Sequence, residues 1–506
     1  MKVKYIFQGL TCSLLLTVAS CSLDYDPVDT YSDVTEGVVE ETGEKVVFKD
    51  KAAVEAHMTT IHNKLHDQQE HWYVDLLLIA DAHSDNAYGG TTGAEAIPFE
   101  ENSIDGSSSI LTRDWDRYLG DVAVANQLIC NIDNVKDATL TTEERNSYKA
   151  QAKIFRSMIW FDMVRLWGNI PVVTTVAEDI TSGNVEEVYP SYFPPQKTEL
   201  EVYQQIEEDL LDAVKYAPDQ TGDKTQFTKS VARTLLAKIY AEKPLRDYDK
   251  VVQYCNAIAD DGFDLVDDLS DIFGMNAAGT DIKMKNTKES ILEAQYVSGN
   301  GNWCTWMFGR DLVNYDNNFT WAKWVTPSRD LIKAFNDEGD TKRFNEAVVY
   351  YECTWSNYYP ADHYPFMFKC RSAYNSIIKY RYADVLLLKA EALIMGEKQD
   401  LEGAAKIIDR IRERAGLGKL STSVRSNKDA MLNALLKERR LELAFEGQRW
   451  FDLCRLDKVE EVMNAVFAKD SGRKSLKNIF NEYSYKMAIP QSAIDANENL
   501  AQNPGY

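Results

Sequence analysis

Apolar residues recur every three or four positions over several long stretches, the spacing that gives a helix one apolar face. In residues 147–167, Phe155 and Ile159 belong to such a stripe, and Gly168 with Pro171 then ends it. The same periodicity predicts helices over residues 198–217, 229–242, 248–260, 380–396, 401–415 and 427–446, the last of which can continue to 453. The pattern therefore predicts a mainly α-helical fold.

Four of these helices form two sequence-adjacent pairs, 229–242 with 248–260 and 380–396 with 401–415. Small residues occur where the paired helices would cross, namely Ala232, Ala237, Ala241, Ala390, Ala392, Ala404 and Ala405. Such pairs look like tetratricopeptide-type hairpins, although no strict repeat period is visible. Helix hairpins form a rigid scaffold, and the long insertions between them carry function.

Residues 262–376 break the helical pattern. They contain five of the ten tryptophans, many Tyr and Asn residues and a Gly-containing turn at 298–302. Short strands are predicted at 290–296 and 346–351. We interpret this stretch as a long irregular, aromatic-rich insertion that carries the ligand-binding site.

The first twenty residues have the pattern of a targeting segment. Lys2 and Lys4 precede an apolar run over 5–18, which is too short to span a bilayer. Small residues then lead to Cys21, as in a lipoprotein signal peptide, so residues 1–20 are predicted to be removed and Cys21 to be lipidated. The alternative is an ordinary secretory signal that contains Cys21.

The polar, acidic stretch over 21–46 is predicted to be a tether, because it has little apolar surface to bury. Residues 47–506 are then a single helical domain with the insertion at about 262–376. No other segment of the sequence is long and apolar enough to cross a membrane.

The formal net charge of −23 argues against nucleic acid as a partner, since such binding depends on many Lys and Arg contacts. The cysteines show no C-x-x-C spacing. Cys353 and Cys370 are the best candidates for a disulfide, whereas Cys130, Cys255 and Cys454 are predicted to be buried thiols in helices.

Several motifs, in order along the chain, resemble those of the SusD/RagB family of outer-membrane nutrient-binding lipoproteins. They are CSLDYDP at 21–27, FRSMIWFDMVRLWGNIPV at 155–172, RYADVLLLKAEA at 381–392, ERRLELAFEGQRWFDL at 438–453 and IPQSAIDANENLAQNPGY at 489–506. One departure is Asp409, where family members commonly carry Asn, and we expect no functional consequence from it.

The resemblance implies a SusD-like α-helical fold with tetratricopeptide-like hairpins. It also implies a lipid anchor in the outer membrane, exposure on the cell exterior and a complex with a SusC-like TonB-dependent transporter. In that picture the protein captures an oligosaccharide, or less often a peptide, and delivers it to the transporter.

Sugar capture needs flat aromatic faces for the C–H side of a ring and fixed polar groups for its hydroxyls. Two tryptophan pairs in the insertion have Asn neighbours: Trp303 with Trp306, and Trp321 with Trp324 beside Asn318. At least one of the four is predicted to stack on the ligand, although each alone can equally be part of the core. Tyr359 is a further candidate.

A second candidate is the loop at 81–90, where Asp85, Asn86 and Tyr88 precede two glycines. The alternative is a helix-terminal turn whose side chains cap backbone groups. Arg371 is a candidate contact for a hydroxyl or carboxylate.

Other charged residues of the motifs are predicted to be structural, forming buried ion pairs that orient the hairpins. They are Arg156, Arg165, Asp384, Glu391, Arg439, Arg440, Glu442 and Arg449. No catalytic signature supports the remaining hypothesis, a glycoside hydrolase with two carboxylates, so the protein is predicted not to be an enzyme.

No cofactor is predicted, except that Asp260-Asp261 or Asp267-Asp268 can hold a structural calcium. His62 and His66 have the i, i+4 spacing of a zinc pair but no third ligand. They are interpreted as a solvated helix face rather than a metal site.

Overall fold

The computed structural model describes residues 38–39, 45–90, 95–297, 300–303, 325–353 and 358–506. The chain divides into two compact units, Met1–Val47 and Phe48–Tyr506. In the first, β1 (Val38–Val39) pairs antiparallel with β2 (Lys45–Val46). The described residues do not include the predicted signal peptide, Cys21 or most of the tether. The cleavage at residue 20 and the lipidation of Cys21 therefore stay predictions.

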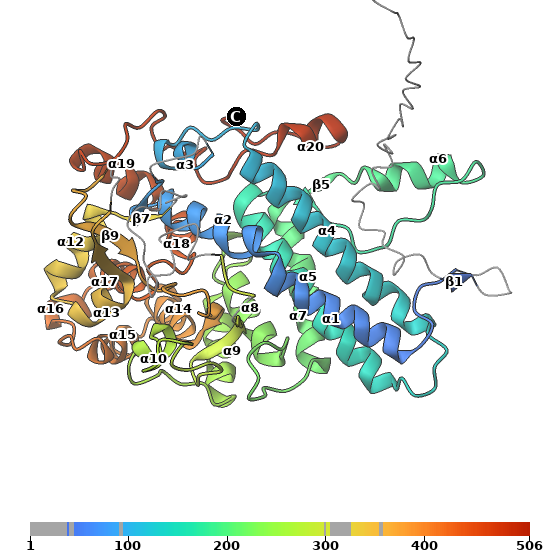
Figure 1. Ribbon diagram of the computed structural model, residues 1–506, viewed down its shortest axis with the longest axis horizontal. Helices are drawn as coiled ribbons and strands as arrows, with labels where there is room; N and C mark the ends of the chain where they lie inside the picture. The colour runs from blue at the N-terminus through green and yellow to red at the C-terminus, as the bar shows by residue number, and fades with distance from the viewer. Residues whose placement is uncertain (1–37, 40–44, 91–94, 298–299, 304–324, 354–357) are drawn as a thin grey trace, which may run out of the picture. The chain divides into compact units, whose positions relative to one another are not determined.

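Long helices build most of the second unit (Figure 1). They are α1 (Lys51–Asp67), α4 (Ser109–Asn131), α5 (Thr142–Trp167), α7 (Glu199–Tyr216), α8 (Lys229–Ile239), α9 (Tyr248–Asp260), α14 (Tyr382–Met395), α15 (Leu401–Arg414) and α17 (Lys428–Glu442). Each of α4, α5, α7, α8, α9 and α14 packs against the next, and α14 also contacts α15 and α17. The mainly α-helical prediction is confirmed, and the tetratricopeptide-like character of the hairpins stays a prediction.

Local sequence explains where these helices begin and end. Thr141 and Glu144 form a capping box at the start of α5, which satisfies its free N–H groups, and the helix stops at Gly168 with φ +73°. The predicted continuation of the 427–446 helix to 453 is wrong. Phe445 and Gly447 adopt positive φ values, so the chain turns and a new helix, α18 (Arg449–Arg455), begins.

The segment after α1 has an unusual winding. A π-helical turn, η1 (Glu70–Val74), is followed by α2 (Asp75–Leu77) and a second π turn, η2 (Leu78–Ala82). The segment contacts α4 on one side, and η2 contacts α18. Wider π turns are rare in helices and often lie at functional sites.

The described parts of residues 262–376 are more regular than predicted. They contain α10 (Ser270–Phe273), β6 (Ser290–Ala294), β7 (Thr326–Pro327), α12 (Arg329–Glu338), α13 (Thr341–Ala347), β8 (Val348–Tyr351) and β9 (Tyr364–Met367). The two predicted strands are therefore present in shortened form. Antiparallel pairing of β6 with β10 (Ile377–Arg381) ties this stretch to the start of α14.

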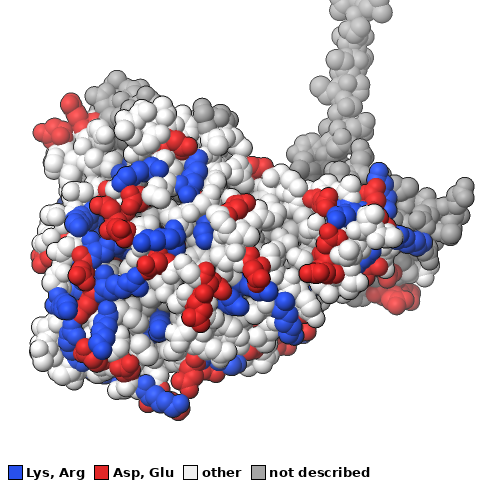
Figure 2. Space-filling view, turned by 90° about the horizontal axis from the view of Figure 1, so that it is seen from below, with Lys and Arg blue, Asp and Glu red and all other residues white. Residues whose placement is uncertain are grey.

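Shorter elements complete the unit: β3 (Ala87–Tyr88), α3 (Ile97–Glu101), η3 (Ile132–Asn134), β4 (Ile170–Pro171), α6 (Val185–Val188), η4 (Tyr189–Tyr192), β5 (Gln196–Lys197), η5 (Lys243–Leu245), α16 (Thr422–Arg425), α19 (Val459–Lys469) and α20 (Gln491–Ala496). Within the described part of the chain, every helix is too short or too polar to span a bilayer. Figure 2 shows acidic and basic side chains interspersed on one face, despite the acidic total.

Candidate functional site

Trp303 is the described aromatic of the insertion that most clearly faces solvent, with 43% of its surface exposed. Its backbone N–H donates to the side-chain oxygen of Gln69 at 2.7 Å, and the Gln69 amide donates back to the carbonyl of Gly301 at 3.2 Å. Gln69 is buried just beyond α1. The scaffold therefore holds the backbone of the turn that presents this ring.

Asn302 fastens the same turn from the other side. Its buried side-chain amide donates to the carbonyls of Ser372 and Asn375 at 3.0 and 2.8 Å. The thiol of Cys370 lies 3.3 Å from its amide oxygen. Because the backbone of the turn is held in this way, the turn loses little conformational entropy when a ligand stacks on the Trp303 ring.

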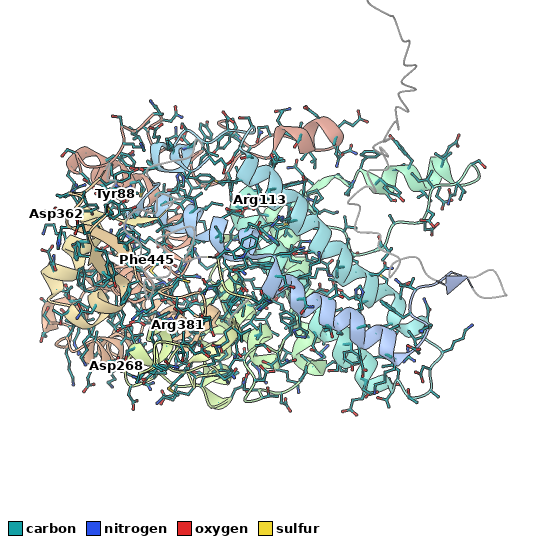
Figure 3. The ribbon with its side chains drawn as sticks, viewed as in Figure 1. Tyr88, Arg113, Asp268, Asp362, Arg381 and Phe445 are labelled. Atoms are coloured by element: carbon teal, nitrogen blue, oxygen red, sulfur yellow. The ribbon has the colours of Figure 1, made fainter. Side chains whose placement is uncertain are left out.

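A hollow adjoins this turn, since Cys370 also lines it. Its deep side is formed by buried apolar and aromatic residues, including Trp72, Leu76, Leu77, Phe273, Met367 and Phe445. The side chains come from η1, α2, α10, β9 and the turn before α18, so distant parts of the sequence build one wall. Figure 3 places Phe445 in the left part of the view, between Tyr88 and Arg381.

Three lysines that line the hollow, Lys238, Lys369 and Lys379, are each paired with a carboxylate. Lys238 pairs with Asp384 and Lys369 with Glu446, while the ammonium of Lys379 lies 2.7 Å from a carboxylate oxygen of Asp162. Burial lowers the pKa of each lysine, and the neighbouring carboxylate opposes that shift. Each ammonium also lies within 6 Å of an aromatic ring of the lining, as Lys379 does over Trp72 at 5.1 Å.

The loop at 81–90 is buried and its polar groups serve the fold. Both oxygens of Asp85 accept from Arg449, at 2.8 and 2.9 Å, and Arg440 lies 3.2 Å away. These guanidinium groups hold the pKa of Asp85 well below its usual range, although burial opposes them. Asn86 accepts from Arg440 at 2.9 Å, and the Tyr88 hydroxyl donates to Asp470 at 2.7 Å.

Asp81 joins this loop to the turn before α18. Its carboxylate accepts from the backbone N–H groups of Phe445 and Gly447, at 3.0 and 3.3 Å, and from the Asn86 amide at 2.9 Å. Burial raises its pKa to about 6, and these hydrogen bonds only partly offset that rise. The arrangement favours the turn-capping interpretation of the loop over direct ligand contact.

The two other described candidates are also engaged internally. Arg371 is buried, pairs with Glu346 at 2.7 Å and lies over the ring of Phe368. Tyr359 is half-buried and its hydroxyl donates to the carbonyl of Pro327 at 2.7 Å. The remaining candidates, Trp306, Asn318, Trp321 and Trp324, lie outside the described residues and stay predictions.

The prediction of buried ion pairs among the motif residues is confirmed. Arg156 binds Asp209, Arg439 bridges Asp384 and Asp452, and Arg455 binds Glu391. No sequence pattern predicts the residue that completes the largest of these ion clusters. Glu289, from the insertion, meets Arg381, Arg414 and, through them, Glu442 in the scaffold.

Three smaller predictions are corrected. Cys370 keeps a free thiol, so it forms no disulfide with Cys353, and Cys130 is exposed rather than buried. His62 and His66 are half-buried and stack on Phe227 and Tyr296, each with 4.6 Å between ring centroids, so their helix face is not solvated.

The acidic loops considered for calcium are used elsewhere. Asp261 binds Arg233 and Ser230, while Asp267 lies 3.3 Å from Lys288. Within the described ranges, no group of three or more His, Cys, Asp or Glu side chains is placed to hold a metal ion.

Comparison with known proteins identifies the family. Residues 371–506 match the family described as "SusD family", and residues 39–241 match the one described as "Starch-binding associating with outer membrane". "SusD-like protein P2" of Formosa agariphila is 25% identical, over 97% of this chain and 98% of its own length. This chain belongs to the SusD/RagB family.

Solved structures agree with that membership at the level of the fold. A SusD-like protein from Bacteroides fragilis superposes with a TM-score of 0.72 at 22% identity, covering 92% of this chain and 99% of that one. A surface glycan-binding protein A from Bacteroides thetaiotaomicron, solved with laminarihexaose, gives 0.69 at 19% identity, covering 90% and 99%.

The SusD/RagB signatures themselves form the scaffold rather than the site. Arg381 and Glu442, from two separate signatures, meet at 2.7 Å in the buried ion cluster. The residues that hold the Trp303 turn, Gln69 and Asn302, lie outside these signatures. The sequence suggests a role for Asn302 in holding the turn, because it is the neighbour of Trp303. No pattern in the sequence suggests such a role for Gln69, which is a single polar residue beyond a helix.

Proposed function

We propose that this SusD/RagB protein is a surface lipoprotein that captures oligosaccharide at Trp303 and delivers it to a SusC-like TonB-dependent transporter in the outer membrane. The observation that carries the proposal is the exposed Trp303 ring on a turn held by Gln69 and Asn302. A fixed, solvent-facing aromatic beside a hollow suits the flat C–H face of a sugar ring.

The relatives support binding rather than catalysis. The chain is a binding protein and not an enzyme, in keeping with its family and with relatives named as laminarin-binding and surface glycan-binding. One family description also names association with the outer membrane. A purified sample incubated with an oligosaccharide that it binds should therefore yield no product by chromatography.

The test of capture is calorimetric titration of the wild type and Trp303→Ala against a panel of neutral oligosaccharides and oligopeptides. We expect one class of oligosaccharide to bind and Trp303→Ala to weaken it about tenfold to a hundredfold, with an unchanged melting temperature. Tyr216→Ala is the matched control, because this aromatic on α7 is similarly exposed at 47%. Binding of oligopeptides alone would replace the glycan assignment with the peptide alternative.

Anchoring and delivery need cell experiments. A lipid probe should label the wild type but not Cys21→Ala, and surface protease should reach the protein on intact cells. A tagged wild type should co-purify from detergent-solubilised outer membranes with a TonB-dependent barrel protein. Labelling of Cys21→Ala would contradict the anchor, and purification without any such barrel would contradict the transporter complex.

A further inference from the structure

We infer that the hollow beside Trp303 receives a small apolar substituent, such as an acetyl ester, carried by a neutral oligosaccharide that stacks on Trp303. This inference rests on the proposed function and names the class of glycan that it would select. The ring would contact the sugar, and the hollow would contact a group attached to it.

The lining is suited to an apolar group. Trp72, Leu77, Phe273, Met367 and Phe445 are all buried and present apolar surface from five different elements. An unoccupied apolar cavity gains little from water, whereas a methyl or acyl group that enters it leaves water and makes dispersion contacts.

The free space limits the size of that group. The hollow has a free volume of about 70 Å³, counted as the space that the centre of a water-sized group can occupy. One water needs about 10–15 Å³ of this volume, so roughly five non-hydrogen atoms fit. An acetyl ester fits within this limit, and a whole hexose has more than twice as many atoms. A sugar ring must therefore remain outside, at the level of Trp303.

The charges around the hollow disfavour an anionic substituent. Lys238, Lys369, Lys379 and Arg165 line the hollow, and each already pairs with Asp384, Glu446 or Asp162, the last of which is shared by Lys379 and Arg165. An anion entering the hollow would have to compete with these carboxylates for their cations, and breaking a buried ion pair is costly.

The entrance adjoins the aromatic platform. Cys370, Ser376 and Ile377 are among the part-exposed members of the lining, unlike the buried residues on its deep side. Cys370 touches Asn302, whose neighbour in the chain is Trp303. The turn that carries Trp303 therefore borders the hollow at Cys370. The hydroxyl of Ser376 makes no hydrogen bond to the described residues and is available, after a side-chain rotation, to an ester carbonyl.

The test compares paired probes on the full-length mature protein. They are naturally acetylated xylo-oligosaccharides and laminari-oligosaccharides acetylated to a low degree, each beside its alkali-deacetylated form, with butyl acetate as an ester that carries no sugar. Calorimetric titration should show roughly fivefold to tenfold tighter binding of one acetylated sample than of its deacetylated partner, since one buried methyl and its contacts distinguish them.

Two variants change the hollow in opposite directions. Ile377→Phe adds bulk at the entrance, so it should remove the preference for the acetylated form and keep the melting temperature. Leu211→Phe adds the same ring on the exposed surface of α7 and should change nothing. Leu77→Ala enlarges the deep side of the hollow, so it should shift the preference from the acetylated oligosaccharide towards the same oligosaccharide esterified with butyrate. An unfolded variant could not show such a gain.

The outcomes separate this inference from the proposed function. Equal binding of acetylated and deacetylated glycans by the wild type, with Trp303 still required, would overturn the hollow's role and leave glycan capture intact. Binding of butyl acetate that Ile377→Phe abolishes, with no glycan bound in any form, would support the hollow as an ester site and overturn the proposed function. A retained preference in Ile377→Phe, with its melting temperature unchanged, would also overturn the inference.

Discussion

Gln69 and Trp303 lie 234 positions apart, yet the backbone N–H of Trp303 donates to the Gln69 side chain at 2.7 Å. Because Gln69 also donates to Gly301, one side chain replaces two hydrogen bonds that the turn would otherwise make with water. The position of the proposed aromatic platform therefore depends on a residue from a distant part of the sequence.

Gln69→Ala should weaken oligosaccharide binding although it removes no ligand contact. The turn loses two hydrogen bonds, so Trp303 samples more orientations and more entropy is lost when a ligand binds. We expect a several-fold loss of affinity and about 1–2 kcal/mol of lost folding stability. Titration and urea unfolding measure the two effects, with the exposed α1 residue Asn63→Ala as control. Unchanged affinity in Gln69→Ala would show that the turn is held by Asn302 alone.

Most of the scaffold could be predicted because each helix carries its own local instructions. The stripe in α5, its capping box and the stop at Gly168 are all sequence-local features. The break between α17 and α18 was missed because the positive φ of Phe445, an unusual conformation for a bulky residue, is stabilised by distant contacts such as that of its N–H with Asp81.

The candidate site was harder to predict, because exposure and pairing are properties of the tertiary structure. Asp85 has the composition of a ligand-binding loop around it, but its partners Arg440 and Arg449 come from more than three hundred residues away. Trp303 could be named from the clustering of aromatic and Asn residues. The hollow beside it could not, since its walls come from five separate segments.

The Asp85–Arg449 pair should be important for stability and neutral for ligand contact. Arg449→Met leaves a buried carboxylate with Arg440 beside it and the charge of Arg473 nearby, so we expect a loss of about 3–5 kcal/mol in the free energy of unfolding. The double variant Asp85→Asn with Arg449→Met should recover part of that loss. Arg410→Met is the control, because the Arg410–Asp264 pair is about half exposed and should contribute no more than about 1 kcal/mol. Equal costs for the two single variants by urea unfolding would contradict this account.

Asp81 should make stability fall as the pH rises from about 4 to about 6. Its folded pKa of about 6 lies above the unfolded value near 4, so the folded state holds the proton more tightly. The contribution, of order 3 kcal/mol, is complete below pH 4 and disappears as the pH rises through 6. Asp81→Asn should flatten the unfolding free energy over this window, whereas Asp267→Asn, with a side chain 96% exposed, should not. A slope that persists in Asp81→Asn would assign it to other groups.

The buried carboxyls of Asp75 and Asp114 should give a second pH dependence, at the wall that carries Trp72. Asp75 pairs with Arg113, and Asp75 Oδ1 and Asp114 Oδ1 accept no N–H donor. Burial and the neighbouring Asp75 raise the pKa of Asp114 well above its usual range, although Arg113 and Arg117 oppose the shift. We expect Asp114 to keep a proton that it can donate to Asp75, which would join α4 to α2.

Because the folded pKa of Asp114 is raised, the stability that this proton contributes is complete below the unfolded pKa near 4 and is lost as the pH rises through the folded value. Asp114→Asn places a permanent N–H donor against Asp75, so it should lose stability less steeply than the wild type towards alkaline pH. Urea unfolding from pH 4 to 9 measures the difference, with Asp267→Asn again as control. Parallel pH profiles for Asp114→Asn and the wild type would mean that the two carboxyls do not share a proton. If they do share one, the pair fastens residues 70–82 to α4, and this segment should open more often as the pH rises. Its amide hydrogen exchange in the wild type should then accelerate with pH by more than the intrinsic chemical rate does, and the variant should show no such excess.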